Sequence, residues 1–302
     1  MSAVCQPFEE KRYLVVVADD FGLSTSINEA VALACENGVL TAASIVAGGN
    51  AFEEAVNLAL RYVKLSIGLH VMLSDGCPVL SPAEIPGLVN GNGHFDKSPI
   101  RAGITYWRSR KNLAHQIEAE VKAQFDKVEK AGIHLTHVDC HHHLHIHPFL
   151  FPIIAKEAAR REIAWIRIPS EPWSIVLGLH TPILDVKAFL IWLIFRPLIA
   201  WNLQVTKRWG LRVMDHVYGL SGTGKINENY LLGLLSYVKD IASEIYLHPD
   251  LGSSQGREET KAITSGRIRE RLQTLGLKLV GFRELSGLLL SDFKNTHCGR
   301  GL

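Results

Sequence analysis

The fold is decided by the stretch YLVVVADDFG, which covers residues Tyr13–Gly22. Its first six residues form an apolar run that contains three β-branched valines, a pattern typical of a buried strand in a parallel sheet. Two aspartates follow directly, and the periodicity then predicts a helix over Ile27–Glu36, with Ser24 and Ser26 as candidate N-caps. A buried strand followed by a helix is the repeating unit of an α/β sheet, so this stretch predicts that class of fold.

The same alternation of strand and helix recurs along the rest of the chain. We expect further strands over residues 40–47, 65–70, 133–140, 164–168, 244–248 and 277–282, and helices over 51–61, 112–130, 149–161 and 257–275. Seven or so such units predict an α/β fold in the form of a (β/α) barrel, complete or incomplete. An open doubly wound sheet is the alternative, although no G-x-G-x-x-G motif follows the first strand to suggest a dinucleotide site.

Two segments interrupt this alternation. Residues 74–103 are rich in glycine and proline, and residues 173–215 are long and strongly apolar. The chain has 302 residues, of which 47% are hydrophobic, and that is enough for a sizeable core. Barrels of about 250 residues routinely form one domain. We therefore expect one domain over residues 1–302, with an apolar insert at about 173–215.

Composition and charge exclude several classes of partner and location. The 32 basic residues nearly balance the 30 acidic ones, so no basic stripe of the kind that binds nucleic acid is expected. The five cysteines form no C-x-x-C pair and are expected to be free thiols in a reducing compartment. The first residues, Met1–Arg12, contain no apolar h-region of a secretory signal. These features predict a cytoplasmic protein without a nucleic-acid partner, and they carry no prediction of its oligomeric state.

Polar residues of the metal-ligating types stand where several predicted strands end. They are Asp19 and Asp20, His70, the tract that begins at His137, and His248. In (β/α) barrels the loops at the carboxyl ends of the strands converge on one mouth, which carries the active site. We therefore expect these side chains to meet. Two adjacent carboxylates repel each other, so one of them needs a cation or a proton nearby.

The tract HVDCHHHLH, residues 137–145, is the most specific of these features. On an extended strand, His137, Asp139 and His141 share a face. If a helical turn follows, His141 and His145 come together at i, i+4 spacing. Asp139 is then placed to orient a liganding histidine through the second ring nitrogen. A solvated histidine-rich loop without an ion is the alternative.

A carboxylate with two or three imidazoles makes a mixed oxygen and nitrogen site that keeps open positions for water and substrate. By ligand softness it suits Zn, Mn, Fe, Co or Ni better than Mg. A bound ion would lower the pKa of its water and polarise a carbonyl group. The same residues fit a metal phosphoesterase, which normally uses two ions and more basic residues, or a non-haem iron oxygenase. The absence of a long run of alternating antiparallel strands argues against the oxygenase.

At these residues the sequence resembles a known family. The segments ADDFG (Ala18–Gly22), GLH (Gly68–His70), HVDCHHHLH and LHP (Leu247–Pro249) resemble the YdjC-like (ChbG) carbohydrate deacetylases, over about Tyr13 to Phe282. The resemblance implies a (β/α) barrel related to polysaccharide deacetylases. It also implies a hydrolase that removes the acetyl group from an N-acetylated amino sugar.

Carried over residue by residue, the resemblance implies three metal ligands, a general base and a general acid. These are Asp20, His70 and His141 for the ion, Asp19 for the base, and His248 for the acid. We keep His145 as a reserve ligand. Arg167, at another strand end, is expected to bind a sugar hydroxyl, to buttress Asp19, or to form a structural ion pair. The resemblance implies Mg, whereas ligand softness favours Zn, Mn, Ni or Co, so the identity of the ion stays open.

Two features resemble the hopanoid-biosynthesis-associated HpnK branch of this family. Cys140 stands in place of a serine common in the histidine motif, and the apolar segment Trp173–Asp215 is long. That branch is linked to deacetylation of an N-acetylglucosaminyl head group on a hopanoid lipid, which implies a glycolipid substrate. A deacetylase of soluble chito-oligosaccharides and a non-catalytic glycolipid-binding protein are the alternatives. The intact aspartate pair argues against the second, because binding alone needs no free base.

Within this segment, the apolar run Ile183–Leu203 is expected to contact the core or a membrane. Asp185, Lys187 and Arg196-Pro197 interrupt it, and a transmembrane helix needs about 20 uninterrupted apolar residues. The proline is expected to kink or end a helix. Tryptophans and basic residues surround the run, which suits a segment in the membrane interface. We expect peripheral contact with the cytoplasmic membrane face through about 183–203, or a groove for a lipid tail, with a buried helix pair as the alternative.

Overall fold

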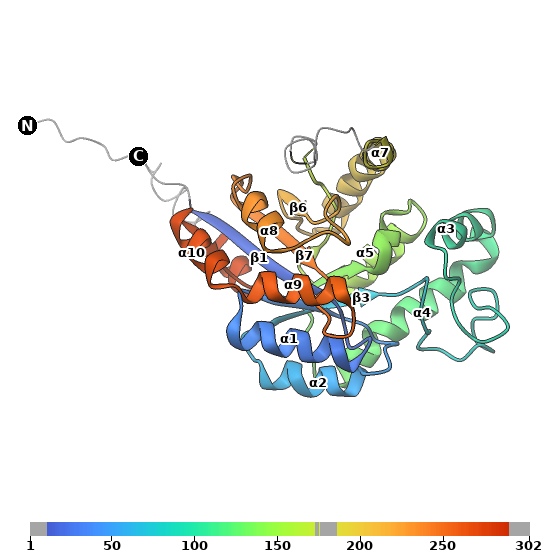
Figure 1. The fold of residues 1–302 in the computed structure, drawn as a ribbon. Helices are drawn as coiled ribbons and strands as arrows, with labels where there is room; N and C mark the ends of the chain where they lie inside the picture. The colour runs from blue at the N-terminus through green and yellow to red at the C-terminus, as the bar shows by residue number, and fades with distance from the viewer. Residues whose placement is uncertain (1–10, 173–174, 176–185, 290–302) are drawn as a thin grey trace, which may run out of the picture.

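The computed structural model describes residues 11–172, 175 and 186–289 of the chain (Figure 1). The side chains of residues 186–192 are also outside this description. The expectation about a secretory signal falls on residues 1–10, and part of the apolar segment falls on residues 173–174 and 176–185. Both therefore lie outside the described residues.

Within the described part of the chain, eight strands form one sheet, and all their pairings are parallel. Seven strands lie side by side in the order β5-β4-β3-β2-β1-β7-β6, and β8 pairs with the first residues of β1. The strands are β1 (Arg12–Phe21), β2 (Ala42–Ile45), β3 (Ser66–Val71), β4 (His137–Cys140), β5 (Trp165–Ile166), β6 (His216–Tyr218), β7 (Ala242–Leu247) and β8 (Leu277–Leu279).

The sheet is curled, and an isolated bridge connects its two edges. The edge strands are β5 and β6, and Arg212, just before β6, bridges to Trp165 of β5. There the N–H of Arg212 donates to the carbonyl of Ala164 at 2.7 Å, and the N–H of Ile166 donates to the carbonyl of Arg212 at 3.0 Å. This is an incomplete (β/α) barrel of parallel strands, as predicted, and not the open doubly wound sheet.

Helices cover the outside of the sheet (Figure 1). The side chain of Ser24 caps the first helix by accepting the N–H of Ile27 at 3.3 Å, as predicted. The helices are α1 (Thr25–Asn37), α2 (Phe52–Arg61), α3 (Pro99–Arg108), α4 (Arg110–Lys130), the 3₁₀ helix η1 (His141–Ile146), α5 (Leu150–Arg160), α7 (Val186–Trp209), α8 (Glu228–Leu235), α9 (Ser254–Thr264) and α10 (Gly266–Thr274).

The prediction of a single helix over residues 257–275 is wrong, because the structure has two helices there. Ser265 adopts an extended conformation, with φ −69° and ψ 134°, and so ends α9. Its side chain accepts the N–H of Arg267 and caps α10. The periodic pattern of apolar residues continues across Ser265 because α9 and α10 bury their apolar residues in the same hydrophobic cluster. A capping serine therefore ends one helix and begins the next.

The two faces of β1 pack against different layers. Val15 and Val17 pack in the barrel interior with residues such as Tyr246, whereas Leu14 and Val16 pack under the outer helices. All of these side chains are buried, which accounts for the unbroken apolar run in the sequence. Because side chains alternate along a strand, the next residue on the interior face after Val15 and Val17 is Asp19.

The apolar segment contributes α7, which continues through Pro197. Of the two outcomes expected for this proline, a kink or the end of a helix, the structure excludes the end. Pro197 and Leu193, whose carbonyl loses its usual donor, are both exposed, so water can replace the lost hydrogen bond. The helix packs against α5 and η1, and the buried side chain of Asn202 donates to the carbonyl of Ile146 at 3.1 Å.

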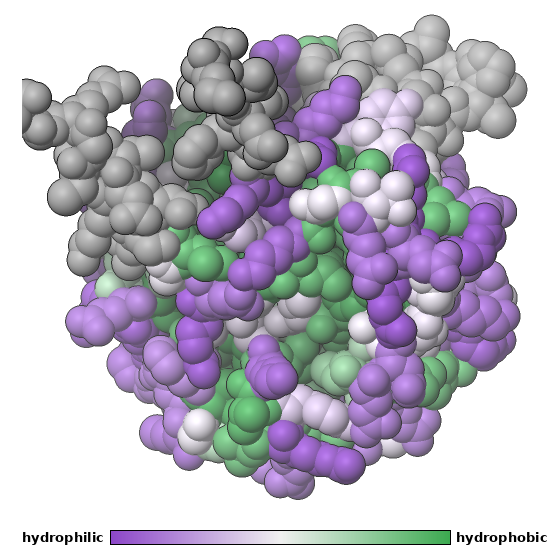
Figure 2. All heavy atoms as spheres, turned by 90° about the vertical axis from the view of Figure 1, so that its left-hand side faces the viewer, coloured by the Kyte–Doolittle hydropathy of each residue, from purple (hydrophilic) through white to green (hydrophobic). Residues whose placement is uncertain are grey.

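The described helices include none that is long and apolar enough to cross a membrane. On the side of the molecule where β1 begins, polar and apolar side chains are interspersed (Figure 2). The opposite side, towards which β1 and β3 run, carries the residues described next.

Candidate functional site

A β-bulge at the end of β1 places two adjacent carboxylates in one site. Val17 and Ala18 pair with consecutive residues of β2, but the next pair joins Phe21 to Ile45, so β1 contains one extra residue. Asp20 in this bulge has a positive φ of 62°. In a regular strand Asp19 and Asp20 would point to opposite faces, and a bulge re-aims the side chain at this point.

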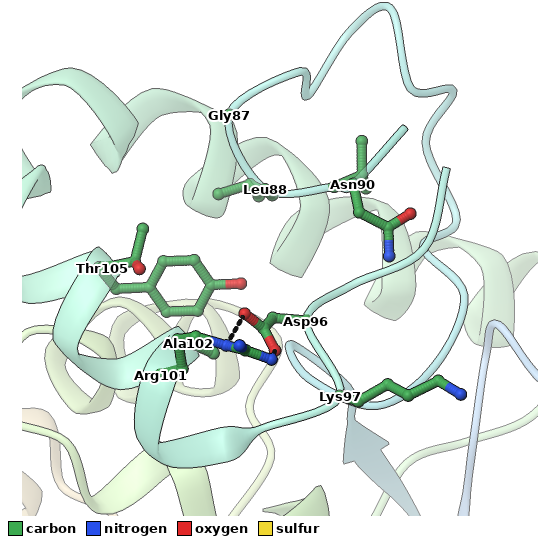
Figure 3. Close-up of a pocket in the computed structure, with 10 residues that line it drawn as sticks. Gly87, Leu88, Asn90, Asp96, Lys97, Arg101, Ala102 and Thr105 are labelled. Carbon is green, nitrogen blue, oxygen red and sulfur yellow. Dashed lines mark hydrogen bonds and ion pairs between the residues drawn. The ribbon is translucent and has the colours of Figure 1, made fainter. Parts of the chain in front are cut away.

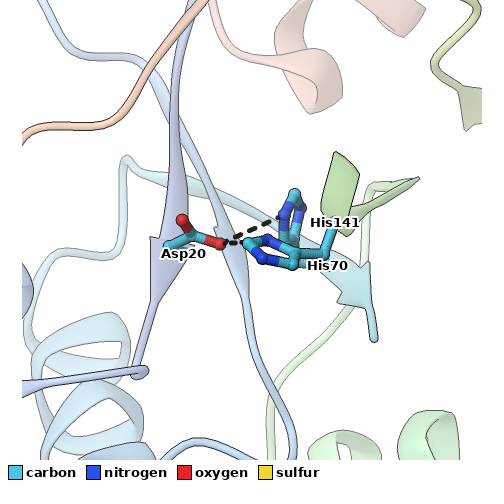
Figure 4. A group of neighbouring side chains, drawn as sticks. All are labelled: Asp20, His70 and His141. Carbon is cyan, nitrogen blue, oxygen red and sulfur yellow. Dashed lines mark hydrogen bonds and ion pairs between the residues drawn. The ribbon is translucent and has the colours of Figure 1, made fainter. Parts of the chain in front are cut away.

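Asp20 faces two histidines from other elements. Its Oδ1 lies 2.9 Å from Nδ1 of His141, at the start of η1, and 3.3 Å from Nε2 of His70, near the end of β3. Figure 4 shows the carboxylate turned towards both imidazoles. One ligand atom from each of the three residues lies within 4.8 Å of the others. The structure thus brings together the three residues proposed as ligands.

The chemistry of this group fits a divalent cation. The Nε2 of His70 is buried and has no hydrogen-bond partner. Burial lowers the pKa of His70, but the charges of Asp139 and Asp19 outweigh it and raise that pKa to about 10. Burial raises the pKa of Asp20, but the neighbouring imidazoles of His141 and His70 hold it well below its usual value. The site therefore attracts positive charge, and its donors are those that divalent transition metals accept.

Arg167 connects the proposed base to the metal-binding group. Its guanidinium donates to both oxygens of Asp19 at 2.6 and 2.8 Å, and it lies 2.8 Å from Asp139 Oδ2. Asp139 in turn accepts the Nδ1–H of His70 at 2.7 Å. All these side chains are buried. Of the roles considered for Arg167, the structure places it against Asp19, in a chain of contacts that ends at His70, one of the proposed ligands.

Two residues of this network were missed by the sequence analysis. Glu244, in the middle of β7, accepts the Nε–H of Arg167 at 2.5 Å. Burial raises the pKa of Glu244 to about 7, and the charges of Asp139 and Asp19 add to it against the opposing effect of Arg167. Ser44 of β2 donates to Asp139 at 2.7 Å. The only signal in the sequence was a polar residue inside an otherwise apolar strand.

The histidine tract does not make the predicted helical turn. His142 and His143 have positive φ values of 55° and 52°, so the chain leaves the right-handed helix directly after His141. His145 consequently turns away from His141, is fully buried, and donates its Nε2–H to the carbonyl of Arg167 at 2.7 Å. The prediction that His141 and His145 come together at i, i+4 spacing is therefore wrong. His145 belongs to none of the candidate metal-binding groups among the described residues.

The first part of the tract behaves as an extended strand. His137 and Asp139 share a face of β4, as predicted, and both contact Ser44. The ring of His137 stacks on Phe282 with the ring centroids 4.0 Å apart. Burial lowers the pKa of His137 to about 3, so it is neutral. His137 therefore supports the strand and lies outside the metal-binding groups of the described residues.

His248 lies on the neighbouring strand from Asp19. The last pair of β1 with β7 joins Ala18 to Leu247, and Asp19 and His248 follow directly. The backbone N–H of His248 donates to Glu259 at 2.6 Å, and its half-buried ring meets Tyr246 edge-on with the centroids 5.8 Å apart. The backbone of His248 thus fixes this residue in a position beside Asp19, the proposed base.

Several known proteins are similar to this chain in sequence or in fold. Carbohydrate deacetylases of Geobacillus stearothermophilus and Brevibacillus brevis are each 37% identical to this chain, over 175 and 156 residues. The matches cover 58% and 52% of this chain, and the chain spans only 65% and 59% of those relatives. A structure from Enterococcus faecalis, named for cellobiose-phosphate cleavage, superposes with a TM-score of 0.69 at 20% identity, covering 91% of this chain and 99% of that one.

The structural likeness shows a shared fold. The family described as YdjC-like protein matches residues 13–274, which include every proposed ligand and both proposed catalytic residues. This chain therefore belongs to the YdjC-like protein family.

Proposed function

We propose that this protein is a metal-dependent hydrolase that removes the acetyl group from an N-acetylated amino sugar. The observation that carries the proposal is the position of Asp19, a buried carboxylate that Arg167 holds beside the group of Asp20, His70 and His141. Hydrolysis of an amide needs both a base and an activated water, and this arrangement supplies a candidate for each. The carbohydrate deacetylases to which the chain is similar support the same activity.

In this proposal, each residue of the candidate site has one role in the hydrolysis. A divalent ion, when bound by Asp20, His70 and His141, supplies Lewis acidity that activates water and polarises the acetyl carbonyl. Asp19 accepts a proton from the attacking water, and the two N–H groups of Arg167 hold its carboxylate in place. His248 donates a proton to the departing nitrogen, because an unprotonated amine leaves poorly. The products are acetate and the free amino sugar.

The finer part of the proposal concerns the substrate and the location. We propose an N-acetylglucosaminyl head group on a lipid, of the hopanoid type to which the sequence resemblance points. Peripheral contact with the cytoplasmic membrane face, through about 183–203, would give access to it. Leu193 and Ile194 support this contact, because 50% and 60% of their surfaces are exposed. A deacetylase of soluble chito-oligosaccharides is the alternative.

One observation keeps a metal phosphoesterase as a second candidate. Asp75, His141 and His142 form another group whose ligand atoms lie within 4.8 Å of one another, and it shares His141 with the first. Phosphoesterases commonly use two such ions. Against this, the guanidinium of Arg167 bonds three carboxylates and so is engaged before any phosphate could bind.

The test is an acetate-release assay with Mg, Zn, Mn, Co or Ni added singly, on chito-oligosaccharides and on an N-acetylglucosaminyl lipid. An aryl phosphate serves as the comparison. Asp19→Asn should keep the ion and lose roughly 10²–10⁴ of the rate, because the amide accepts no proton. In the same assay, His248→Ala should change the pH–rate profile. The proposal fails if no N-acetylated substrate releases acetate with any ion, or if phosphate alone is released.

A further inference from the structure

Helix α3 has two apolar faces, and only one of them is covered. Ala102 and Tyr106 are buried against the body of the protein. On the other face, Ile100, Ile104 and Trp107 are 76%, 57% and 46% exposed. Their spacing of four and three residues places them in one stripe along the helix. An exposed stripe of this kind on a helix marks a surface that binds something apolar.

This stripe forms one wall of an apolar groove. The groove has a volume of about 430 Å³, within the range of roughly 300–1,000 Å³ that is typical of small-molecule sites. Its other walls come from η1, with Leu144 and Ile146, and from α7, with Phe195 and Leu198. We call this cavity the α3–α7 groove.

The α3–α7 groove begins beside the candidate metal centre. His142 and His143 line it, and both follow His141 directly in the chain. The ring centroids of His141 and His142 lie 4.0 Å apart. A molecule that reached from the groove past His142 would therefore arrive at the group of His141, Asp20 and His70.

A second cavity beside α3 has a mixed lining. It has a volume of about 360 Å³, and apolar residues such as Leu88 line it together with Asn90, Asp96, Lys97 and Arg101 (Figure 3). Arg101 donates to Asp96 there at 2.7 and 2.9 Å. Burying a hydrocarbon against these groups would desolvate them without compensation. The two cavities beside α3 therefore suit different ligands, and only the α3–α7 groove suits a hydrocarbon.

We propose that the α3–α7 groove holds the hydrocarbon part of a lipid-linked amino sugar while the sugar reaches the metal centre. The inference rests on the proposed deacetylase function. The occupant is committed to a chain attached to the substrate, because the groove adjoins the candidate catalytic residues and its lining is apolar almost throughout. A protein segment would bring backbone N–H and carbonyl groups that this lining leaves without partners.

The first experiment varies the substrate. Methyl, butyl and octyl β-glycosides of N-acetylglucosamine, used below their micelle concentrations, are compared as deacetylation substrates. Each buried methylene strengthens binding roughly threefold to fourfold, so KM should fall by about tenfold or more from methyl to octyl. The kcat should stay nearly constant, because the chain does not touch the reacting atoms.

The second experiment fills or charges the groove. Gly103 lines the groove, and a Cβ there would lie 3.6 Å from Leu144 and His147, an ordinary contact, so the side chain introduced by Gly103→Leu can begin without a clash. Gly103→Leu and Ile104→Glu should each abolish the advantage of the octyl glycoside while leaving the methyl glycoside unaffected. The matched control is Leu60→Glu on α2, at a residue that is 52% exposed, and it should change neither substrate.

The outcomes separate this inference from the function on which it rests. If the methyl glycoside is not deacetylated, the proposed function fails. If it is deacetylated and KM does not depend on chain length, or if both groove variants keep the octyl advantage, the groove proposal is overturned. A dimer that Ile104→Glu converts to monomer in sedimentation equilibrium would also overturn it, because a second copy would then be the occupant. Thermal unfolding of each variant checks that it is folded.

Discussion

The side chain of Arg167 shows how single residues set the chemistry of this site. Its positive charge faces the buried carboxyl groups of Asp19, Asp139 and Glu244. Removing one partner of such a buried ion pair leaves an uncompensated charge and typically costs several kcal/mol. The residue is therefore a positioning residue: it orients the proposed base, and through Asp139 it orients His70.

The roles of two histidines in the tract can be separated by substitution. His141→Ala should abolish binding of a divalent ion, because it removes a nitrogen that lies 2.9 Å from Asp20. His145→Ala should keep the ion but lower the free energy of unfolding by about 1–3 kcal/mol, because the carbonyl of Arg167 loses its buried donor. Metal content after dialysis and calorimetric titration, with thermal unfolding, measure both effects. Full metal occupancy in His141→Ala would show that the ligand assignment is wrong.

Glu244 makes the stability of the protein depend on pH. Its pKa is raised from the usual 4.5 to about 7, so between these values the folded state binds more protons than the unfolded chain. The stability it contributes is fully present below pH 4.5 and is lost as the pH rises through about 7. Glu244→Gln removes this dependence. In metal-free protein, its unfolding free energy relative to wild type should increase as the pH rises across this window, by up to about 1.4 kcal/mol per pH unit.

Urea unfolding of the two proteins at several pH values measures this difference. Glu53→Gln, at an exposed position on α2, is the control and should show no such trend. A difference between Glu244→Gln and wild type that stays constant from about pH 4.5 to 7 would contradict the prediction.

At the scale of elements, the strongly patterned segments could be predicted and the weakly patterned ones could not. The apolar run at Tyr13 and the periodic helices α1, α2, α4 and α5 are found close to their expected bounds. The strand β6 has three residues and α8 has eight, which is too short for a periodic signal. Helix α3 was not predicted, because it begins in a segment whose glycines and prolines did not indicate a helix. The sequence nevertheless contains its capping residue, Ser98, and a proline, Pro99, which is tolerated at the first position of a helix.

The candidate site was predictable to the extent that it follows strand ends. Asp20, His70 and His141 could be placed together because parallel strands end at the same side of the barrel. The bulge at Asp20 and the left-handed residues His142 and His143 could not, since backbone conformation at single residues leaves no periodic trace. Those local conformations keep His145 apart from the group of Asp20, His70 and His141.

At the scale of the whole molecule, six of the ten large apolar side chains that are exposed in the described part of the chain belong to α3 and α7. Ile100, Ile104 and Trp107 belong to α3, and Leu193, Ile194 and Trp201 belong to α7. Basic residues such as Lys207 and Arg208 follow in the last turn of α7. Aromatic, apolar and basic side chains together are typical of a surface that lies in a membrane interface.

A vesicle assay tests whether this surface contacts a membrane. The wild type should co-sediment with anionic liposomes, less so at high salt because the basic residues contribute through screened charges. The variant Leu193→Glu with Ile194→Glu should stay folded, lose this binding, and keep its activity on a short soluble substrate. Ile241→Glu, at an exposed apolar position before β7, is the control. If the wild type ignores liposomes at low salt, the proposal of membrane contact is withdrawn.

The single bridge between Arg212 and Trp165 makes the gap between β5 and β6 a seam in the barrel wall. The chain that runs from one side of this seam to the other contains α7. Two of the three proposed ligands, Asp20 and His70, come from β1 and β3, which lie away from the seam along the sheet. Evolution can therefore lengthen, shorten or rewrite the connecting chain, and with it one wall of the groove, without moving these two side chains. A barrel with a seam is in this sense more evolvable than a closed one, since the wall of its groove can change while most of its candidate metal centre is inherited unchanged.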